Sequence, residues 1–233
     1  MAFDAVAPRD LVWSLEAAIS APPPQRARGL AETARRAVEL AHGGGITRVA
    51  DLTGLARIGV PVVAVMRPDA LSLSVSSGKG TSLAAAYVSG LMESLELYYA
   101  ERFAQHTPFR AMAECCEIAD CENLPRVRDA PPIDLRALDD VEMSRGRDLF
   151  TDRPIAVPFD LVHAAFHPGW WRRGYGFLTS TNGLAGGNSR AEAALHALCE
   201  VIERDAHALF LATDPGCSLA DRASLDWTSI DDT

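Results

Sequence analysis

The chain has 233 residues, of which 48% are hydrophobic and 23% are charged, a globular composition with ample length for a buried core. The formal net charge of −9 repels a phosphate backbone and disfavours a general nucleic-acid-binding role. The number of cysteines is odd (five), there is no C-x-x-C pair, and the chain does not begin with a signal peptide, so we predict reduced thiols in a cytoplasmic protein. The apolar runs are far shorter than the ~18 residues of a membrane helix, so we predict no membrane span.

The first 43 residues are predicted to be helical. Two amphipathic stretches, residues 10–20 and 27–41, flank the helix breaker "APPPQ", and the run "HGGG" ends the second stretch. We therefore predict an N-terminal helical segment over residues 1–43 and a second domain over residues 44–233.

β-strand patterns follow the helical segment. The stretches "ITRVADLTG" and "PVVAVMR" are rich in β-branched residues, and "LSLSV" (residues 71–75) alternates strictly. The next stretch, "SSGKGTS", is predicted to be a glycine-rich turn. It leads into a long helix over residues 82–103, with Thr81 or Ser82 as its N-cap.

The second half of the chain is less regular. Residues 104–140 are predicted to be irregular, residues 145–162 to form a β-hairpin with "TDRP" as its turn, and residues 167–188 to form a loop. A second long helix is predicted over residues 189–211. Strands and helices do not alternate regularly, so the fold class is α+β, with mixed α/β layers.

Each long helix carries a pair of glutamates three positions apart. In the first helix, Glu93 and Glu96 lie on neighbouring turns opposite an apolar stripe. In the second helix, Glu200 and Glu203 lie away from the apolar stripe that includes Leu198 and Ile202. Carboxylates in pairs suit Mg²⁺, and helix N-termini after glycine-rich loops suit phosphate oxygens.

Simpler explanations stay open at this point. The glutamates could be solvated residues on amphipathic helices. Ser189 and Glu192 could form a capping box, and Lys79 could lie in an ordinary exposed turn. His196 and His207 are expected to be hydrogen-bonded structural residues and Cys199 a packed thiol, while a zinc site in "ECCEIADC" is disfavoured by the cysteine spacing.

Three stretches together resemble the YcaO family: "GITRVADLTGLARIGVPVVAVMRP", "SLSVSSGKGTSLAAAYVSGLMESLELYYAE" and "NGLAGGNSRAEAALHALCEVIERDA". The ordered motifs are S-x-x-x-E-x-x-E and N-x-x-x-E followed by E-x-x-E-R. The resemblance implies a YcaO-like fold, and since family domains usually continue further, we expect its C-terminal part to be missing. Leu97 stands where many members have arginine, as in some members of the TfuA-associated branch.

The resemblance also implies a chemistry, in which ATP and Mg²⁺ activate a peptide backbone amide. A nucleophile adds to the amide carbon, the oxygen takes the γ-phosphoryl group, and phosphate then leaves. An internal Cys, Ser or Thr side chain gives an azoline, whereas an external sulfur donor gives a thioamide. The substrate would be a precursor peptide or a protein.

The family motif assigns roles to particular residues of this chain. The implied Mg²⁺-binding residues are Glu93, Glu96, Glu200 and Glu203. The implied ATP-binding residues are Arg26, Thr33, Lys79, Ser89, Asn188, Glu192 and Arg204.

The phrase "GITRVADLTGLARIGVP" is most similar to the TfuA-associated branch, so a TfuA-like partner protein is implied as well. Two alternatives remain beside the enzyme. One is a non-catalytic protein that binds a peptide or a partner, and the other is an accessory factor for methylthiolation of a ribosomal protein. The oligomeric state is not fixed by the sequence, and a homodimer is left open.

Overall fold

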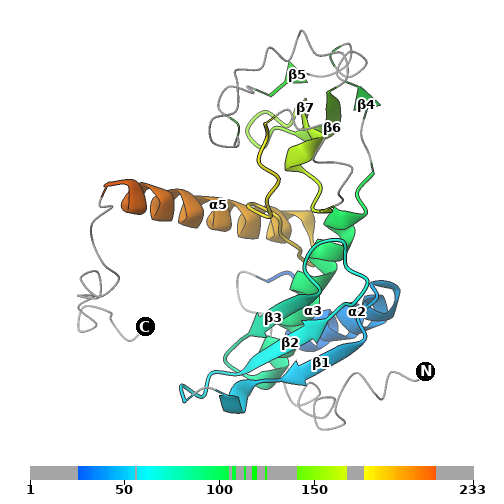
Figure 1. The fold of residues 1–233 in the computed structure, drawn as a ribbon, viewed down its shortest axis with the longest axis vertical. Coiled ribbons are helices and arrows are strands. Elements are labelled where there is room, and N and C mark those ends of the chain that lie inside the picture. The colour runs from blue at the N-terminus through cyan, green and yellow to red at the C-terminus, as the bar shows by residue number, and fades with distance from the viewer. Residues whose placement is uncertain are drawn as a thin grey trace.

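The computed structural model describes residues 26–55, 57–104, 107–108, 113, 117–119, 124, 141–166 and 176–213. Two sheets and three long helices make up this described part (Figure 1). The mixed helix-and-sheet architecture confirms the predicted fold class. Within the described residues, none of the helices combines the length and the apolar character needed to cross a bilayer.

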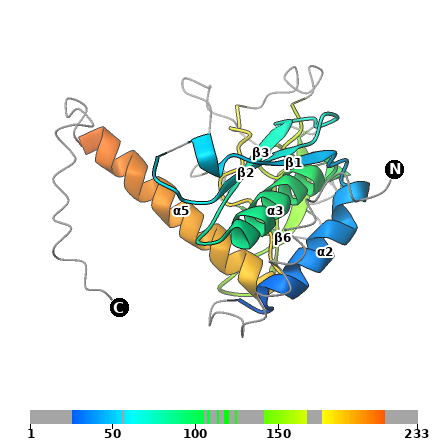
Figure 2. The ribbon, with the colours of Figure 1, turned by 90° about the horizontal axis from the view of Figure 1, so that it is seen from below.

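The first sheet is antiparallel, and two helices lie over one of its faces. Its strands are β1 (Arg48–Asp51), β2 (Val62–Met66) and β3 (Val75–Lys79), in the order β1-β2-β3. Helix α3 (Leu83–Glu101) covers the sheet, and helix α2 (Leu30–Gly43) packs against α3 (Figure 2). A short 3-10 turn (Thr53–Leu55) follows β1.

One hydrophobic core joins these elements. It contains alanines of α2, valines of β2, the apolar stripe of α3, and Ile46 from the connection between α2 and β1. The members are Ala37, Ala41, Ile46, Val63, Val65, Ala86, Tyr87, Leu91 and Leu95. The small side chains of α2 allow the two helices to lie close together. Because α2 shares this core, it is a packed part of the fold; the boundary predicted between residues 43 and 44 stays a prediction.

The second sheet has the order β4-β6-β7-β5. Its strands are β4 (Thr107–Pro108), β5 (Glu117–Ile118), β6 (Glu142–Arg147) and β7 (Pro154–Pro158), and a 3-10 turn (Phe159–Leu161) follows β7. The β6–β7 pair is the predicted hairpin, with Gly146 opposite Ile155. Asp152 in its turn has a φ of 55°.

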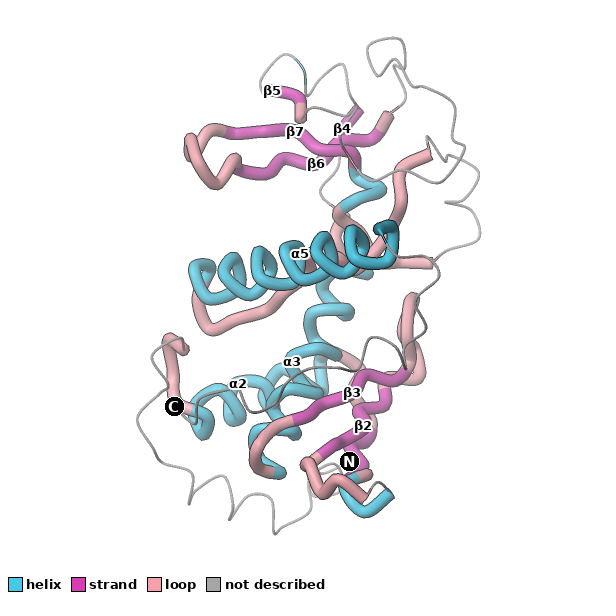
Figure 3. Tube along the Cα trace, turned by 90° about the vertical axis from the view of Figure 1, so that its left-hand side faces the viewer, coloured by secondary structure: helices cyan, strands magenta, loops and turns pink. Residues whose placement is uncertain are grey.

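Helix α5 (Arg190–Thr213) lies between the two sheets at its N-terminal end (Figures 1 and 3). Its apolar stripe is exposed rather than buried: Leu198 is 46% and Ile202 67% exposed. Every residue from Val201 to Ala212 is exposed. The amphipathic pattern therefore predicted the helix correctly, and the described residues do not cover its apolar stripe.

The third strand differs from its prediction. The alternating stretch 71–75 is mostly irregular, with Leu71 and Leu73 exposed, and the strand runs instead through the predicted turn, Val75–Lys79. The cause is the close approach of α3. A Cβ atom on Gly78 would lie 2.0 Å from the carbonyl oxygen of Ala86 and 2.4 Å from the nitrogen of Gly90. The strand under the helix therefore needs glycine rather than leucine.

Both long helices were predicted within two residues of their observed ends. Ser82 is the N-cap of α3, since its side chain accepts a hydrogen bond from the backbone N–H of Ala85. Several predicted segments lie outside the described residues. These are the helix over residues 10–20, most of the irregular stretch 104–140 with its cysteines, most of "PGWWRRGYGF" and the tail after Thr213.

Candidate functional site

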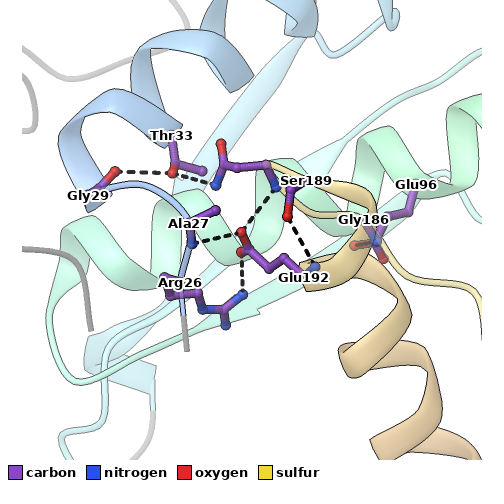
Figure 4. A network of polar contacts seen from close by, with 9 residues as sticks. Arg26, Ala27, Gly29, Thr33, Glu96, Gly186, Ser189 and Glu192 are labelled. Carbon is purple, nitrogen blue, oxygen red and sulfur yellow. Dashed lines mark hydrogen bonds and ion pairs between the residues drawn. The ribbon is translucent and has the colours of Figure 1, made fainter. Parts of the chain in front are cut away.

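A buried carboxylate marks the entrance to α5. Glu192, in the first turn of the helix, is 8% exposed. Its Oε1 accepts a hydrogen bond from the Arg26 guanidinium at 3.1 Å, and its Oε2 accepts from the backbone N–H groups of Ala27 at 3.2 Å and Asn188 at 3.3 Å (Figure 4). Two segments far apart in sequence, residues 26–27 and 188–192, therefore meet at one carboxylate.

The side chain of Asn188 extends this network to α2. Its Nδ2 donates to the Thr33 hydroxyl at 2.9 Å, and that hydroxyl donates to the carbonyl oxygen of Gly29 at 3.1 Å. Arg26, Thr33, Asn188 and Glu192, four of the seven residues assigned to ATP by the resemblance, thus belong to one hydrogen-bonded group.

The donors around Glu192 keep it ionised. Burial raises the pKa of its carboxyl, but the hydrogen bonds from Arg26, Ala27 and Asn188, with the Arg26 charge, lower it more, so the net pKa lies below the ordinary 4.5. The capping box was predicted only half correctly. Ser189 accepts from the Glu192 backbone N–H, but the Glu192 carboxylate accepts from Asn188 and not from Ser189.

A second carboxylate, that of Glu96, lies on α3 and contacts the loop that precedes α5. Glu96 accepts a hydrogen bond through Oε1 from the backbone N–H of Gly186 at 2.6 Å (Figure 4). Burial raises the pKa of Glu96 to about 7; the Gly186 bond opposes this rise, while the carboxylates of Glu93 and Glu200 add to it. The acidic faces of α3 and α5 are therefore near enough to affect each other.

The other acidic residues are more open to solvent. Glu93 is exposed and accepts from the backbone N–H of Ser77 at 3.4 Å. Glu200 forms an ion pair with Arg204 at 3.1 Å, one turn along α5. Glu203 is exposed. The structure thus brings Glu93, Glu96 and Glu200 into one electrostatic neighbourhood, while Glu203 lies exposed further along the helix.

The donor set fits a hard divalent cation. Across the described ranges, no group of three His, Cys, Asp or Glu side chains is close enough to hold a metal ion on its own. Mg²⁺ does not require such a group, because it binds one or two protein carboxylates and completes its shell with phosphate and water. Burial is the main cause of the raised pKa of Glu96, and the two neighbouring carboxylates add to it; a cation would favour the ionised form of such a carboxyl.

Two assigned residues lie on the surface between α3 and the first sheet. Ser89 is half-buried one turn before Glu93, and Lys79 is the exposed last residue of β3. The lysine therefore ends a strand rather than lying in the predicted turn. The roles of both residues toward a nucleotide stay predictions.

Three expectations for α5 were wrong. His196 and His207 are exposed rather than structural, and Cys199 is an exposed free thiol rather than a packed one. The reason is the same in each case, because the helix surface that carries them is not covered by described residues. The three cysteines of "ECCEIADC", on which the zinc alternative depends, lie outside the described residues.

Residue types alone did not identify the backbone donors of the site. Ser77, Gly186 and Ala27 each bind a carboxylate through an N–H group, which any residue but proline provides. The "GGN" stretch before α5 was the available signal, because adjacent glycines permit a close backbone approach.

With this geometry described, comparison with known proteins gives the class. The family model described as "YcaO cyclodehydratase, ATP- and Mg²⁺-binding" matches residues 77–229. The chain belongs to the YcaO family.

Relatives in several organisms match about the same share of the chain. An uncharacterized protein of Methanothermobacter thermautotrophicus is 40% identical over 172 residues, which are 72% of this chain and 43% of the relative. An uncharacterized protein in the tfuA 3′ region of Rhizobium leguminosarum bv. trifolii is 38% identical over 175 residues, 73% of this chain and 40% of the relative.

Two solved structures share the fold. The YcaO from Methanopyrus kandleri bound with AMPPCP and Mg²⁺ matches with a TM-score of 0.59 and 28% identity, over 77% of this chain and 44% of that one. A heterocyclase in complex with substrate and cofactor matches with a TM-score of 0.57 and 20% identity, over 75% of this chain and 27% of that one. The present chain thus spans less than half the length of these relatives.

Proposed function

We propose that this chain forms the ATP- and Mg²⁺-binding part of an enzyme that phosphorylates the oxygen of a peptide backbone amide. One observation carries the proposal. The loop before α5 contacts Glu96, a residue assigned to the metal, through Gly186, and contacts Thr33 and Glu192, residues assigned to the nucleotide, through Asn188. Two groups assigned from sequence motifs are therefore joined by three consecutive residues.

Each group would contribute a different interaction. Arg26 is 54% exposed along its side chain even while it binds Glu192, so its guanidinium has donors left for a phosphate. Asn188, Thr33 and Ser89 would orient the nucleotide by hydrogen bonds. Glu192 would fix Arg26 and the N-terminus of α5 rather than contact phosphate, because two anions repel.

Glu93, Glu96, Glu200 and Glu203 are the carboxylates proposed to hold Mg²⁺. The bound ion would neutralise charge on the phosphate oxygens, as in other phosphoryl transfers. The residues of the chain would place ATP, and the backbone N–H of Gly186 would favour the ionised form of Glu96. The chemistry needs positioning more than a protein nucleophile.

The substrate is proposed to be a ribosomally made peptide or a protein. Support comes from the heterocyclase with bound substrate, which shares the fold. The relative encoded in a tfuA 3′ region supports a TfuA-like partner. The product is an azoline or a thioamide, according to whether the nucleophile belongs to the peptide or to an external sulfur donor.

Calorimetry with ADP and Mg²⁺ tests the proposal. We expect binding by the wild-type chain, and at least a tenfold loss in Glu93→Gln and in Glu203→Ala. Glu39→Gln is a matched control, because Glu39 is an exposed glutamate of α2 outside the site. Absence of nucleotide binding, or equal binding in all four proteins, would contradict the proposal.

A second candidate is a non-catalytic protein that binds a peptide or partner, or an accessory factor for methylthiolation. It is favoured by the state of the assigned carboxylates, because Glu93 and Glu203 are exposed and Glu200 is paired with Arg204. Phosphate release in the presence of peptide and TfuA-like partner separates the candidates. Steady Mg²⁺-dependent release would eliminate the second one.

A further inference from the structure

Gly186 lies so close to Glu96 that a side chain at position 186 would have no room. The backbone N–H of Gly186 donates to Glu96 Oε1 at 2.6 Å, although the residues are 90 positions apart. A Cβ atom on Gly186 would lie 2.9 Å from both Cγ and Oε1 of Glu96 and 3.2 Å from Cε of Met92. Gly186 is not among the glycines with positive φ. Space, and not backbone conformation, therefore requires glycine here.

The hydrogen bond acts on one oxygen of the carboxylate. Oε1 faces the loop, and Oε2 accepts no hydrogen bond from the described residues. An N–H bond to one oxygen fixes the plane of the carboxylate and leaves the other oxygen for a ligand.

The same loop is held at its other end. Two residues after Gly186, the backbone N–H of Asn188 donates to Glu192 and its side chain donates to Thr33. Gly187 is also closely packed, because a Cβ atom there would lie 2.8 Å from the nitrogen of Ala193. The loop therefore has little freedom to move away from Glu96.

We propose that Gly186 is a positioning residue that holds the Glu96 carboxylate, through its backbone N–H and its lack of a side chain, in the orientation that binds a divalent cation. The cation role rests on the proposed function. The contact itself does not, so the two are tested separately.

Amide hydrogen exchange tests the contact without any ligand. We expect the Gly186 amide to be protected in the wild-type chain and in Glu96→Gln, whose side-chain oxygen still accepts the hydrogen bond. Exchange should be at least tenfold faster in Glu96→Ala, which has no acceptor. Equal exchange in the three proteins would overturn the proposal. This arm does not depend on whether a Gly186 variant folds.

Mn²⁺ in place of Mg²⁺ tests the cation role, because its electron paramagnetic resonance spectrum reports binding directly. In the presence of ADP, Gly186→Ala should weaken Mn²⁺ binding by about 10- to 100-fold, the usual effect of groups that orient a metal ligand. Gly54→Ala is the control, since nothing lies within 4 Å of a Cβ atom there and its φ is not positive. It should bind as the wild type does.

A double-mutant cycle separates positioning from general damage. If Gly186 acts through Glu96, Gly186→Ala should cause no further loss when it is added to Glu96→Gln. An equal loss in both backgrounds would overturn the proposal. A wild-type chain that binds neither ADP nor Mn²⁺ would overturn the proposed function and the cation role together, while a protected Gly186 amide in that sample would still support the contact.

Discussion

The guanidinium of Arg67 and the carboxylate of Glu101 form a two-point ion pair that is almost completely buried. Arg67 Nη2 lies 2.6 Å from Glu101 Oε1, and the two side chains are 2% and 0% exposed. Ser72 donates its backbone N–H to the same oxygen at 3.0 Å. The pair joins the end of β2 to the end of α3, the helix that carries Glu93 and Glu96.

Removal of one partner should be strongly destabilising. Glu101→Gln leaves the Arg67 charge buried without its counter-charge, so we expect the free energy of unfolding to fall by about 3–5 kcal/mol in urea denaturation. Arg147→Met is the control, because its ion pair with Asp152 is formed by side chains that are 59% and 84% exposed. Its loss should cost less than about 1 kcal/mol. Similar losses in both variants would contradict the burial argument.

The packing of α3 on β3 predicts a severe effect at a different position. Gly78→Ala would place a methyl group 2.0 Å from the carbonyl oxygen of Ala86, which is backbone and cannot rotate away. We expect a loss of at least about 3 kcal/mol or failure to fold, measured by circular dichroism and urea denaturation. Gly43→Ala is the control, since a Cβ atom there has nothing within 4 Å. A stable Gly78→Ala protein would show that β3 is placed incorrectly.

Arg26 should matter far more than its neighbour Arg28. Arg26→Ala leaves the buried Glu192 carboxylate without its charged partner, so we expect about 1–3 kcal/mol of lost stability, together with weaker ADP binding. Arg28 pairs instead with Glu32, and these side chains are 39% and 41% exposed. Arg28→Ala should change stability by under about 0.5 kcal/mol and leave ADP binding unchanged. Equal effects would remove Arg26 from the site.

These predictions depend on features that the sequence revealed unequally. Helix periodicity located α3 and α5, and the E-x-x-E spacing identified Glu93 and Glu96, because both signals are local. The course of β3 was missed, since the strand is chosen by how near α3 lies and not by the alternation of Leu71 and Leu73. Close approach between distant segments has no local pattern.

The buried ion pair of Arg67 and Glu101 was missed for a related reason. Glu101 is the last residue of α3 and Arg67 follows β2, so both lie outside the E-x-x-E motifs, and only tertiary contact shows that they pair. The amphipathic pattern of α5 had the opposite result. It located an apolar stripe that includes Leu198 and Ile202, and both side chains are exposed in the described structure. Periodicity identifies an apolar face, but it does not identify what covers that face.

The exposure of that stripe makes a direct prediction about stability. Ile202 is 67% exposed, so Ile202→Ala should change the free energy of unfolding by under about 0.5 kcal/mol. Leu91, on the core face of α3, is 0% exposed, and Leu91→Ala should cost about 2–5 kcal/mol. Urea denaturation of both variants measures the difference. A cost above 2 kcal/mol at Ile202 would show that the helix face is covered in solution.

The raised pKa of Glu96 predicts how stability and cation binding depend on pH. A carboxyl with a pKa of about 7 in the folded chain and 4.5 when unfolded binds its proton more tightly when folded. Its contribution to stability is therefore fully present below pH 4.5, falls as the pH rises toward 7, and is absent above that. Over this range, the wild type should lose on the order of 1–3 kcal/mol relative to Glu96→Gln, which does not titrate.

A divalent cation should reverse that loss, because it favours the ionised carboxylate. Protons compete with the cation, so Mg²⁺ binding in the presence of ADP should strengthen by up to about tenfold per pH unit between pH 5 and 7 and then level off. Calorimetry across this range measures the change. Glu96→Gln should bind more weakly and show a flatter dependence, whereas the same steep dependence in Glu96→Gln would mean that another group takes up the proton and that Glu96 does not bind the cation.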